Sequence, residues 1–444
     1  MARETRQPTR RPASLIGGTG PLACQIDPGG NAGGLTAVHD RRSAYSTPRL
    51  YFGLAEYDSE LSKIVAELNR AAPSQKAATR TPQASASLQE LLHFAGRRGA
   101  SDRLLVAGAP AILRVNGALA SGSGAVLDPE DVRGAVLPLL DATQLEELQR
   151  RKAVDFGFER EGLGRFRVNI HHQRGTLAAS IRLLPARIPS LESLHLPVTL
   201  ARLAERRQGL VLVTGPTGCG KTSTLAALID LINTRRAAHV VTIEDPVEYQ
   251  HSNRSAVIEQ IEVGRDTPDF AGTLRSIMRQ TPDVILVGEM RDAETIATVL
   301  TAAETGHLVF GTLHTQDAPE SLERLTNLFP TDRLAQVRMQ LSLGLRAIIC
   351  QRLLPRTGGG RTAAMEILIN SPRIKKLILE GDTTKIPAAI QSSRAEGMQT
   401  FNQALVDLVK AGKVDEADAL RSSPKPDELK MNLKGIYSGT SAMA

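Results

Sequence analysis

The segment GPTGCGKT at residues 215–222 constrains the fold of this chain more than any other part of its sequence. It fits the pattern G-x-x-x-x-G-K-[ST], and it lies between a continuous apolar run at residues 209–214 and a stretch with helical periodicity at residues 222–233. A strand, a glycine-rich loop and a helix in this order point backbone N–H groups at an anion, at the positive end of the helix dipole. The segment therefore predicts a phosphate-binding loop.

The side chains of this loop predict how it would hold a nucleotide. Lys221 would neutralise the β- and γ-phosphates, and the hydroxyl of Thr222 would coordinate Mg²⁺. Cys219 fills a variable position, and because a helix N-terminus favours the thiolate, a redox role for this residue stays open as an alternative. The residues of the loop that we predict to bind the nucleotide are Gly215, Pro216, Thr217, Gly218, Cys219, Gly220, Lys221 and Thr222.

Three further apolar runs, at residues 240–243, 284–287 and 308–313, predict the sheet around the loop. Strands that are apolar on both faces belong to a parallel sheet that is covered by helices on each side. Helical periodicity between the runs, at residues 270–279 and 292–305, supplies such helices. The sequence therefore predicts an α/β fold with a three-layer nucleotide-binding core.

Composition divides the 444 residues into four parts. Residues 1–85 are rich in Gly, Pro and Arg without apolar periodicity, which predicts a leader without regular structure. Residues 86–195 combine a helical stretch within residues 128–150 with alternating apolar strands, which predicts a smaller α/β domain. The core domain follows at residues 196–424, and residues 425–444 are expected to form a flexible tail.

Charge and composition narrow the class of protein. No apolar run reaches the roughly 18–20 residues of a membrane-spanning helix. The net charge of +7 would suit a nucleic-acid partner, but residues 1–85 hold eleven basic against seven acidic residues, more than half of that excess. Aromatic residues, which stack on bases, make up only 3% of the chain. We therefore expect no nucleic-acid partner, although a nucleic-acid translocase on the same core stays open as an alternative of another class.

Acids at the ends of two predicted strands are candidate catalytic groups. Glu289 follows the run at residues 284–287, and its carboxylate can polarise a water molecule or reach Mg²⁺ through water. The segment TIEDPVEY at residues 242–249 places three carboxylates, Glu248 among them, at the C-terminal edge of the sheet, where open α/β folds bind ligands. With Mg²⁺ present, one of these acids can act as a base toward water, although three acids on a surface loop are also ordinary.

Two histidines flank the last predicted strand. His307 precedes the run at residues 308–313 and His314 follows it, and their odd separation places them on opposite faces, so we expect no shared metal site. His314, at the C-terminal end, can face the γ-phosphate, whereas His307 is expected to have a structural or interface role. Arg291 is a candidate phosphate or subunit contact, or part of a helix cap.

With these motifs the chain resembles the secretion-type ATPases of type IV pilus and type II secretion systems, and among them the PilT/PilU-type pilus retraction ATPases. The resemblance covers roughly residues 88–414 and depends on four segments, at residues 215–222, 242–249, 283–289 and 306–315. It implies a RecA-like P-loop core preceded by a PAS-like domain, assembly as a homohexamer, and the hydrolysis of ATP to ADP and phosphate with Mg²⁺.

The resemblance also implies roles for particular residues. Glu248 is the favoured general base, and Glu289 is its partner at the end of the neighbouring strand. Arginines of the N-terminal domain help to close the nucleotide site in this family, and Arg167 and Arg182 are the nearest candidates. The catalytic residues that we expect are Glu248, Glu289, Lys221 and His314, and the Mg²⁺ ligands are Thr222 and, through water, Glu289.

The cysteines bear on the subtype. Assembly and secretion relatives usually carry a four-cysteine zinc insertion after the segment at residues 306–315, whereas residues 316–361 contain only Cys350, so we expect no zinc and favour the retraction type. The expected function is a cytoplasmic hexameric motor for pilus retraction in twitching motility, held at the inner face of the inner membrane by a pilus platform protein. Residues 373–380 have the sequence RIKKLILE where retraction members tend to have AIRNLIRE, so an ATPase of a conjugative, type IVB or type II secretion system stays open.

Overall fold

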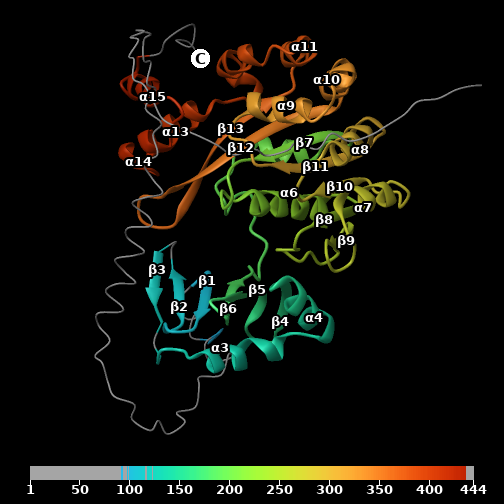
Figure 1. Cartoon of the computed structure of the whole chain (residues 1–444). Helices are drawn as coiled ribbons and strands as arrows, with labels where there is room; N and C mark the ends of the chain where they lie inside the picture. The colour runs from blue at the N-terminus through green and yellow to red at the C-terminus, as the bar shows by residue number, and fades with distance from the viewer. Residues whose placement is uncertain (1–91, 94–97, 99, 116–117, 123, 437–444) are drawn as a thin grey trace, which may run out of the picture. The chain divides into compact units, whose positions relative to one another are not determined.

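The computed structural model describes residues 92–93, 98, 100–115, 118–122 and 124–436 (Figure 1). The leader predicted at residues 1–85 lies outside the described residues. Two sheets organise the described part of the chain.

A six-stranded antiparallel sheet, in the order β3-β2-β1-β6-β5-β4, forms the centre of the domain that precedes the phosphate-binding loop. Val132 and Val136 of one helix and Leu148 of the next pack with strand residues such as Val168 and Ile170 in one core. The domain is the smaller α/β domain that the sequence predicts. Its elements are β1 (Asp102–Val106), β2 (Ile112–Val115), β3 (Ala118–Ser121), α3 (Pro129–Val136), α4 (Ala142–Arg151), β4 (Ala153–Arg160), β5 (Gly164–Gln173) and β6 (Thr176–Leu183).

Two helices, α3 and α4, occupy the region where the sequence predicts one helical stretch. Each begins at an aspartate N-cap: the side chain of Asp128 accepts from the N–H of Asp131, and that of Asp141 accepts from the N–H of Gln144. Pro138 lies between the helices, in a short 3-10 turn, and lacks the N–H that a continuous helix would need. The second cap and the proline divide the helix, which the spacing of leucines alone does not reveal.

A seven-stranded sheet, in the order β13-β12-β7-β11-β10-β8-β9, forms the core domain. Its strands run parallel from β12 to β9, and β13 is antiparallel to β12 at the edge. The elements are α5 (Thr199–Ala204), β7 (Gly209–Thr214), α6 (Lys221–Arg235), β8 (His239–Glu244), β9 (Val257–Glu262), α7 (Phe270–Ile277), β10 (Val284–Val287), α8 (Ala293–Glu304), β11 (Leu308–Leu313), α9 (Ala318–Asn327), α10 (Leu334–Gly344), β12 (Leu345–Pro355), β13 (Arg361–Ile369), α11 (Pro372–Glu380), α12 (Ile386–Ser392), α13 (Phe401–Lys410), α14 (Glu416–Ser422) and α15 (Pro426–Leu433).

The four strands predicted from apolar runs are confirmed, and they lie side by side at the centre of this sheet as β7, β11, β10 and β8. Both faces of β7 are fully buried: Leu210 and Leu212 pack with helices α7 to α12, whereas Val211 and Val213 pack with α5 and α6. The three-layer core is therefore confirmed, while β9, β12 and β13 were not predicted and extend the sheet on both sides.

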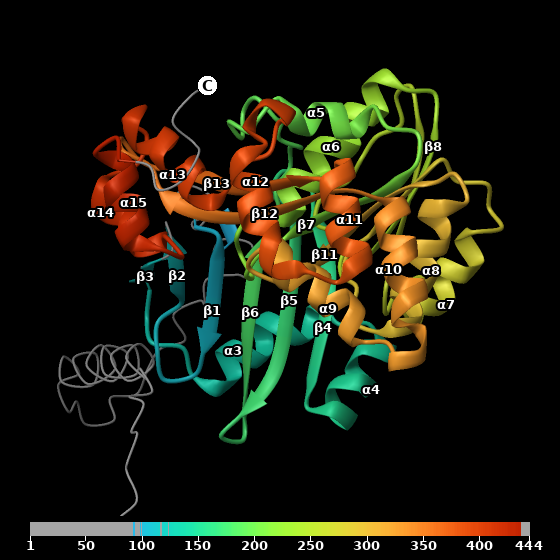
Figure 2. The same ribbon diagram turned by 90° about the horizontal axis from the view of Figure 1, so that it is seen from above.

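The C-terminal helices α13, α14 and α15 lie against the hairpin of β12 and β13 (Figure 2). They bury a separate cluster in which Leu405 and Leu429 have no exposed surface. The flexible tail predicted from residue 425 is therefore wrong for residues 426–433, which form α15, because Leu429 anchors this helix in the cluster. Residues 437–444 lie outside the described part of the chain.

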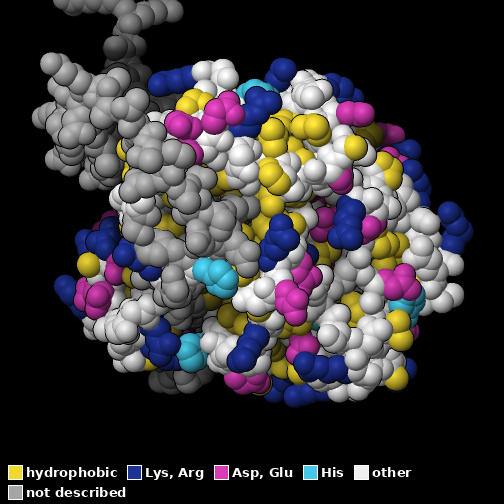
Figure 3. All heavy atoms as spheres, turned by 90° about the horizontal axis from the view of Figure 1, so that it is seen from below, with side chains coloured by type: hydrophobic (Ala, Val, Ile, Leu, Met, Phe, Trp, Pro, Cys, Tyr) yellow, Lys and Arg dark blue, Asp and Glu magenta, His cyan; other side chains and the backbone are white. Residues whose placement is uncertain are grey.

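Within the described residues, no helix combines the length and the apolar character that crossing a membrane requires. Among the described residues seen in Figure 3, the side chains of Lys and Arg are interspersed with those of Asp and Glu.

Candidate active site

The phosphate-binding loop connects the end of β7 to the start of α6, as the sequence predicts. Gly215 and Gly220 have φ angles of 139° and 91°, a region that favours glycine, and Gly220 is the N-cap of α6. The Nζ of Lys221 donates to the carbonyl oxygens of Gly215 at 2.7 Å and Pro216 at 3.2 Å. Burial lowers the pKa of Lys221. The ammonium group is thus held over the loop itself, where phosphate oxygens would bind.

Cys219 is a buried part of the loop. Only 3% of the residue is exposed, and burial raises the pKa of its thiol more than the neighbouring Lys221 lowers it. The hydrogen bonds from the backbone of Cys219 and Lys221 also lower this pKa less than burial raises it. The thiolate is therefore disfavoured, which argues against a redox role for Cys219.

The acidic segment at residues 242–249, at the end of β8, contains acids in two different settings. The carboxyl of Glu244 accepts from the hydroxyl of Thr242 at 2.8 Å and from the Nε2 of Gln260 at 3.1 Å, and burial raises its pKa to about 6. Glu248 is half-buried and lines a cavity of about 100 Å³. Both carboxyls line this cavity, where a reacting water could lie, and Glu244 has a fixed, hydrogen-bonded position there.

Side chains of β9 hold this segment in place. The Nε2 of Gln260 donates to the carboxyl of Glu244 and also to the carbonyl oxygen of Tyr249, the latter at 2.8 Å. The carboxylate of Glu262 accepts from the N–H of Val247 at 3.0 Å. These bonds fix the backbone on both sides of Glu248.

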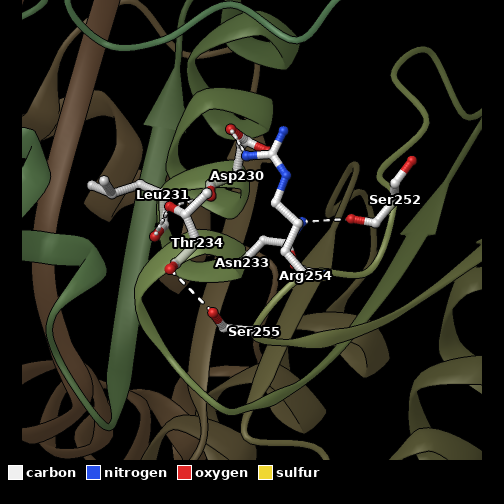
Figure 4. A network of polar contacts seen from close by, with 7 residues as sticks. All are labelled: Asp230, Leu231, Asn233, Thr234, Ser252, Arg254 and Ser255. Atoms are coloured by element: carbon white, nitrogen blue, oxygen red, sulfur yellow. Dashed lines mark hydrogen bonds and ion pairs between the residues drawn. The ribbon is translucent and has the colours of Figure 1, made fainter.

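The segment is also tied to both ends of helix α6. At the start of the helix, the hydroxyls of Ser223 and Tyr249 are hydrogen-bonded at 2.8 Å. Near its end, the buried Asn233 donates to the carbonyl oxygen of Ser252 at 2.8 Å and accepts from the N–H of Arg254 at 3.1 Å (Figure 4). The helix that begins at the phosphate-binding loop therefore also positions the segment that contains Glu248.

Glu289, directly after β10 and Gly288, is held as a carboxylate by two basic side chains. Arg291 donates to its Oε2 at 2.6 Å, and the Nε2 of His314 lies 3.2 Å from its Oε1. The hydrogen bond from Arg291 is the main reason that the pKa of Glu289 is lowered. Arg291 is thus the ion-pair partner of Glu289, and His314 contacts the site through the same carboxylate.

The other predicted residues lie elsewhere. The Nδ1 of His307 is 3.0 Å from the carbonyl oxygen of Ala302, in keeping with a structural role. Arg167 and Arg182 face each other in the register of β5 and β6, and Arg182 forms an ion pair with Asp102 at 2.7 Å. Neither arginine lines the cavity beside Glu248, so their part in closing the nucleotide site stays a prediction.

The structure brings the predicted Mg²⁺ ligands and the predicted base to one place. Thr222, Glu248 and Glu289 line the same cavity, together with Glu244 and Tyr249. A hydroxyl at the loop and carboxylates at the ends of neighbouring strands are the oxygen ligands that Mg²⁺ prefers, so these residues fit the ion. The site can therefore combine a phosphate-binding loop, a divalent cation and a base for water.

Comparisons with known proteins agree with this geometry. The family model described as "Type II/IV secretion system protein" matches residues 180–362. The type IV pilus retraction ATPase PilT of Pseudomonas aeruginosa is 42% identical over 340 residues, which cover 77% of this chain and 99% of the relative.

Solved structures show the same likeness. The structure of the pilus retraction motor PilT with bound ADP has a TM-score of 0.72 and 43% sequence identity, over 78% of this chain and 99% of that chain. The ATPase DotB of Legionella pneumophila has a TM-score of 0.67 and 28% identity, over 78% of this chain and 96% of that chain. Since the similarity spans nearly the whole of these relatives, the chain belongs to the type II/IV secretion system family of RecA-like ATPases and is an ATP hydrolase.

Proposed function

We propose that this ATPase powers the retraction of type IV pili and so supports twitching motility. The observation that carries this proposal is the 42% identity to a pilus retraction ATPase over 99% of that relative. The absence of a cysteine quartet between residues 316 and 361, which contain only Cys350, supports the same subtype.

The chemistry that we propose begins with charge. Lys221 and the backbone N–H groups of residues 215–222 neutralise the phosphates, because phosphoryl transfer depends mainly on positioning and electrostatic stabilisation. Thr222 and, through water, Glu289 would hold Mg²⁺, which would supply further positive charge on the phosphate oxygens. Glu248 accepts a proton from the attacking water. Its place at the cavity, between two backbone anchors, supports this role; Glu244 lines the same cavity, but its carboxyl already accepts hydrogen bonds from Thr242 and Gln260.

Glu289 and His314 act beside this base. The hydrogen bond from Arg291 lowers the pKa of Glu289 and so favours the ionised carboxylate, which would help to hold the cation. His314 orients the same carboxylate through its Nε2. We further propose that Arg167 and Arg182 help to close the nucleotide site.

We also propose that the working form is a homohexamer held at the inner face of the inner membrane by a pilus platform protein, and that it needs no zinc. The membership of the chain in the secretion ATPase family supports this assembly. Light scattering on the purified protein tests it: the mass of six chains is expected, and a monomer with full activity would contradict it.

Deletion of the gene tests the retraction role. We expect loss of twitching with pili still present, because assembly would continue without retraction.

An ATPase of a conjugative, type IVB or type II secretion system is the second candidate, and the similarity to the DotB ATPase favours it. Unchanged twitching with loss of secretion or conjugation would support that candidate, and ATPase activity stimulated by DNA would instead indicate a nucleic-acid translocase.

A further inference from the structure

Gln351 is a buried polar residue that lies outside every motif of the site. It follows Cys350 on β12, and Cys350 pairs with Thr214, the last residue of β7 before the phosphate-binding loop. Only 2% of Gln351 is exposed. The register of the sheet therefore places an amide side chain directly beside the loop.

Both ends of the Gln351 amide are hydrogen-bonded inside the protein. Its Nε2 donates to the carbonyl oxygen of Cys219 at 2.6 Å, and its Oε1 accepts from the hydroxyl of Thr224 at 2.8 Å. The carbonyl can only accept, so the amide nitrogen has to face Cys219 and the amide oxygen has to face Thr224. The two buried bonds therefore fix the orientation of the amide.

The loop lies in close contact with this residue. A Cβ atom on Gly215 would lie 2.3 Å from the carbonyl oxygen of Gln351, and one on Gly220 would lie 2.8 Å from its Nε2. Real Cβ atoms do not approach this closely, so both positions need glycine for space as well as for conformation. The contact leaves the loop no room to move toward β12.

The contact with Cys219 determines which way one peptide group of the loop points. In a trans peptide, the C=O group and the following N–H group point in opposite directions. Because Gln351 holds the carbonyl of Cys219 toward β12, the N–H of Gly220 points away from β12, to the phosphate side of the loop.

We propose that Gln351 is a positioning residue: by holding the carbonyl of Cys219 toward β12, it keeps the N–H of Gly220 turned toward the nucleotide. The proposal rests on the assignment of residues 215–222 to the nucleotide phosphates. Gln351 does not touch the nucleotide; it acts through the peptide group that it holds.

The variant Gln351→Met tests the proposal, because methionine has a similar length but no donor for the carbonyl of Cys219. We expect the affinity for ADP and Mg²⁺ to fall about tenfold or more, since a charge-assisted hydrogen bond to phosphate is weakened. The KM for ATP should rise in parallel, with a much smaller change in kcat, because this bond is made in the ground state and in the transition state alike. Titration of the purified full chain with a fluorescent ADP analogue measures the affinity.

Gln399→Met is the matched control. The Nε2 of Gln399 donates to the carbonyl oxygen of Met365 at 2.9 Å, so the same chemical change removes the same kind of bond on β13. We expect this control to leave nucleotide affinity unchanged, even where its thermal midpoint falls as much as that of Gln351→Met. A purely structural role for Gln351 would give equal results for the two variants.

Unchanged nucleotide affinity in a folded Gln351→Met would overturn the proposal. Where that variant does not fold, the double variant Gln351→Met with Thr224→Val replaces it, since it also lacks the donor for the carbonyl of Cys219 but leaves no buried hydroxyl without a partner; unchanged affinity there would also overturn the proposal. Lys221→Ala separates the two assignments. Full binding of the ADP analogue by Lys221→Ala would refute the assignment of the loop to the phosphates. If Lys221→Ala loses binding but Gln351→Met binds fully, only the role of Gln351 is refuted.

Discussion

The buried carboxyl of Glu366 predicts how the stability of this protein depends on pH. Its Oε1 accepts from the N–H of Ala318 at 2.9 Å, at the first residue of α9. Burial raises the pKa of Glu366 from 4.5 to about 7, against the smaller lowering effect of hydrogen bonds from the N–H groups of Ala318 and Phe401. The native state therefore holds this proton more tightly than the unfolded chain does, so stability falls as pH rises from about 4.5 to about 7.

The size of the effect follows from the two pKa values. Each pKa unit corresponds to about 1.4 kcal/mol, so the rise in the pKa of Glu366 on folding corresponds to a change of about 3 kcal/mol in the free energy of unfolding. In a domain of about 150–250 residues, that is about 6–12 °C in the thermal midpoint. Glu366→Gln keeps an oxygen for the N–H of Ala318 but removes the titration, so it should remove this part of the pH dependence. Glu244, whose pKa is raised to about 6, continues to contribute a smaller fall in both proteins.

Thermal midpoints of the wild type and of Glu366→Gln, measured without nucleotide between about pH 5 and about pH 8, test this reasoning. We expect the thermal midpoint of the variant to rise relative to that of the wild type as pH rises through this range. Glu396→Gln removes an exposed carboxylate and serves as the control, with a curve parallel to that of the wild type. Parallel curves for Glu366→Gln and the wild type would refute the account of Glu366.

Two further predictions concern the nucleotide site. Lys221→Ala should abolish nucleotide binding, because it removes the ammonium group held over the loop; titration with an ATP analogue measures this, and retained binding would contradict it. Tyr249→Phe and Ser223→Ala should each lower kcat about fivefold, since each removes one hydrogen bond of about 1 kcal/mol that ties the segment around Glu248 to helix α6. The double variant should lose no more than either single variant, and additive losses in steady-state ATPase assays would show that the two hydroxyls act independently.

The parts of the fold that sequence reasoning predicts are those with a local signal. The phosphate-binding loop has a fixed spacing of glycines and lysine, and the strands around it are continuous apolar runs. The helix predicted at residues 292–305 follows from residues that are neighbours in the chain, and it is α8, with Asp292 as its N-cap. The acids Glu248 and Glu289 could be named because each lies within four residues of the end of such a strand.

The parts that were missed depend on contacts between distant segments. Gln351 is 127 residues from Thr224, and only the pairing of β12 with β7 brings them together. The one signal in the sequence is that Gln351 directly follows the apolar run AIIC at residues 347–350, which favours a buried polar residue that needs partners. Likewise, Gln260 lies on an amphipathic strand without a continuous apolar run, and its bonds to Glu244 and Tyr249 become visible only in the folded sheet.

The most direct test of the proposed mechanism is the ATP turnover of Glu248→Gln. This variant should bind ATP as the wild type does but lose turnover by about a hundredfold or more, because the amide cannot take a proton from water. Glu244→Gln is the matched control, since Glu244 lies in the same segment but is fixed by Thr242 and Gln260, and it should retain far more turnover than Glu248→Gln. Undiminished turnover in Glu248→Gln would contradict the account and would assign the base to another acid of the cavity.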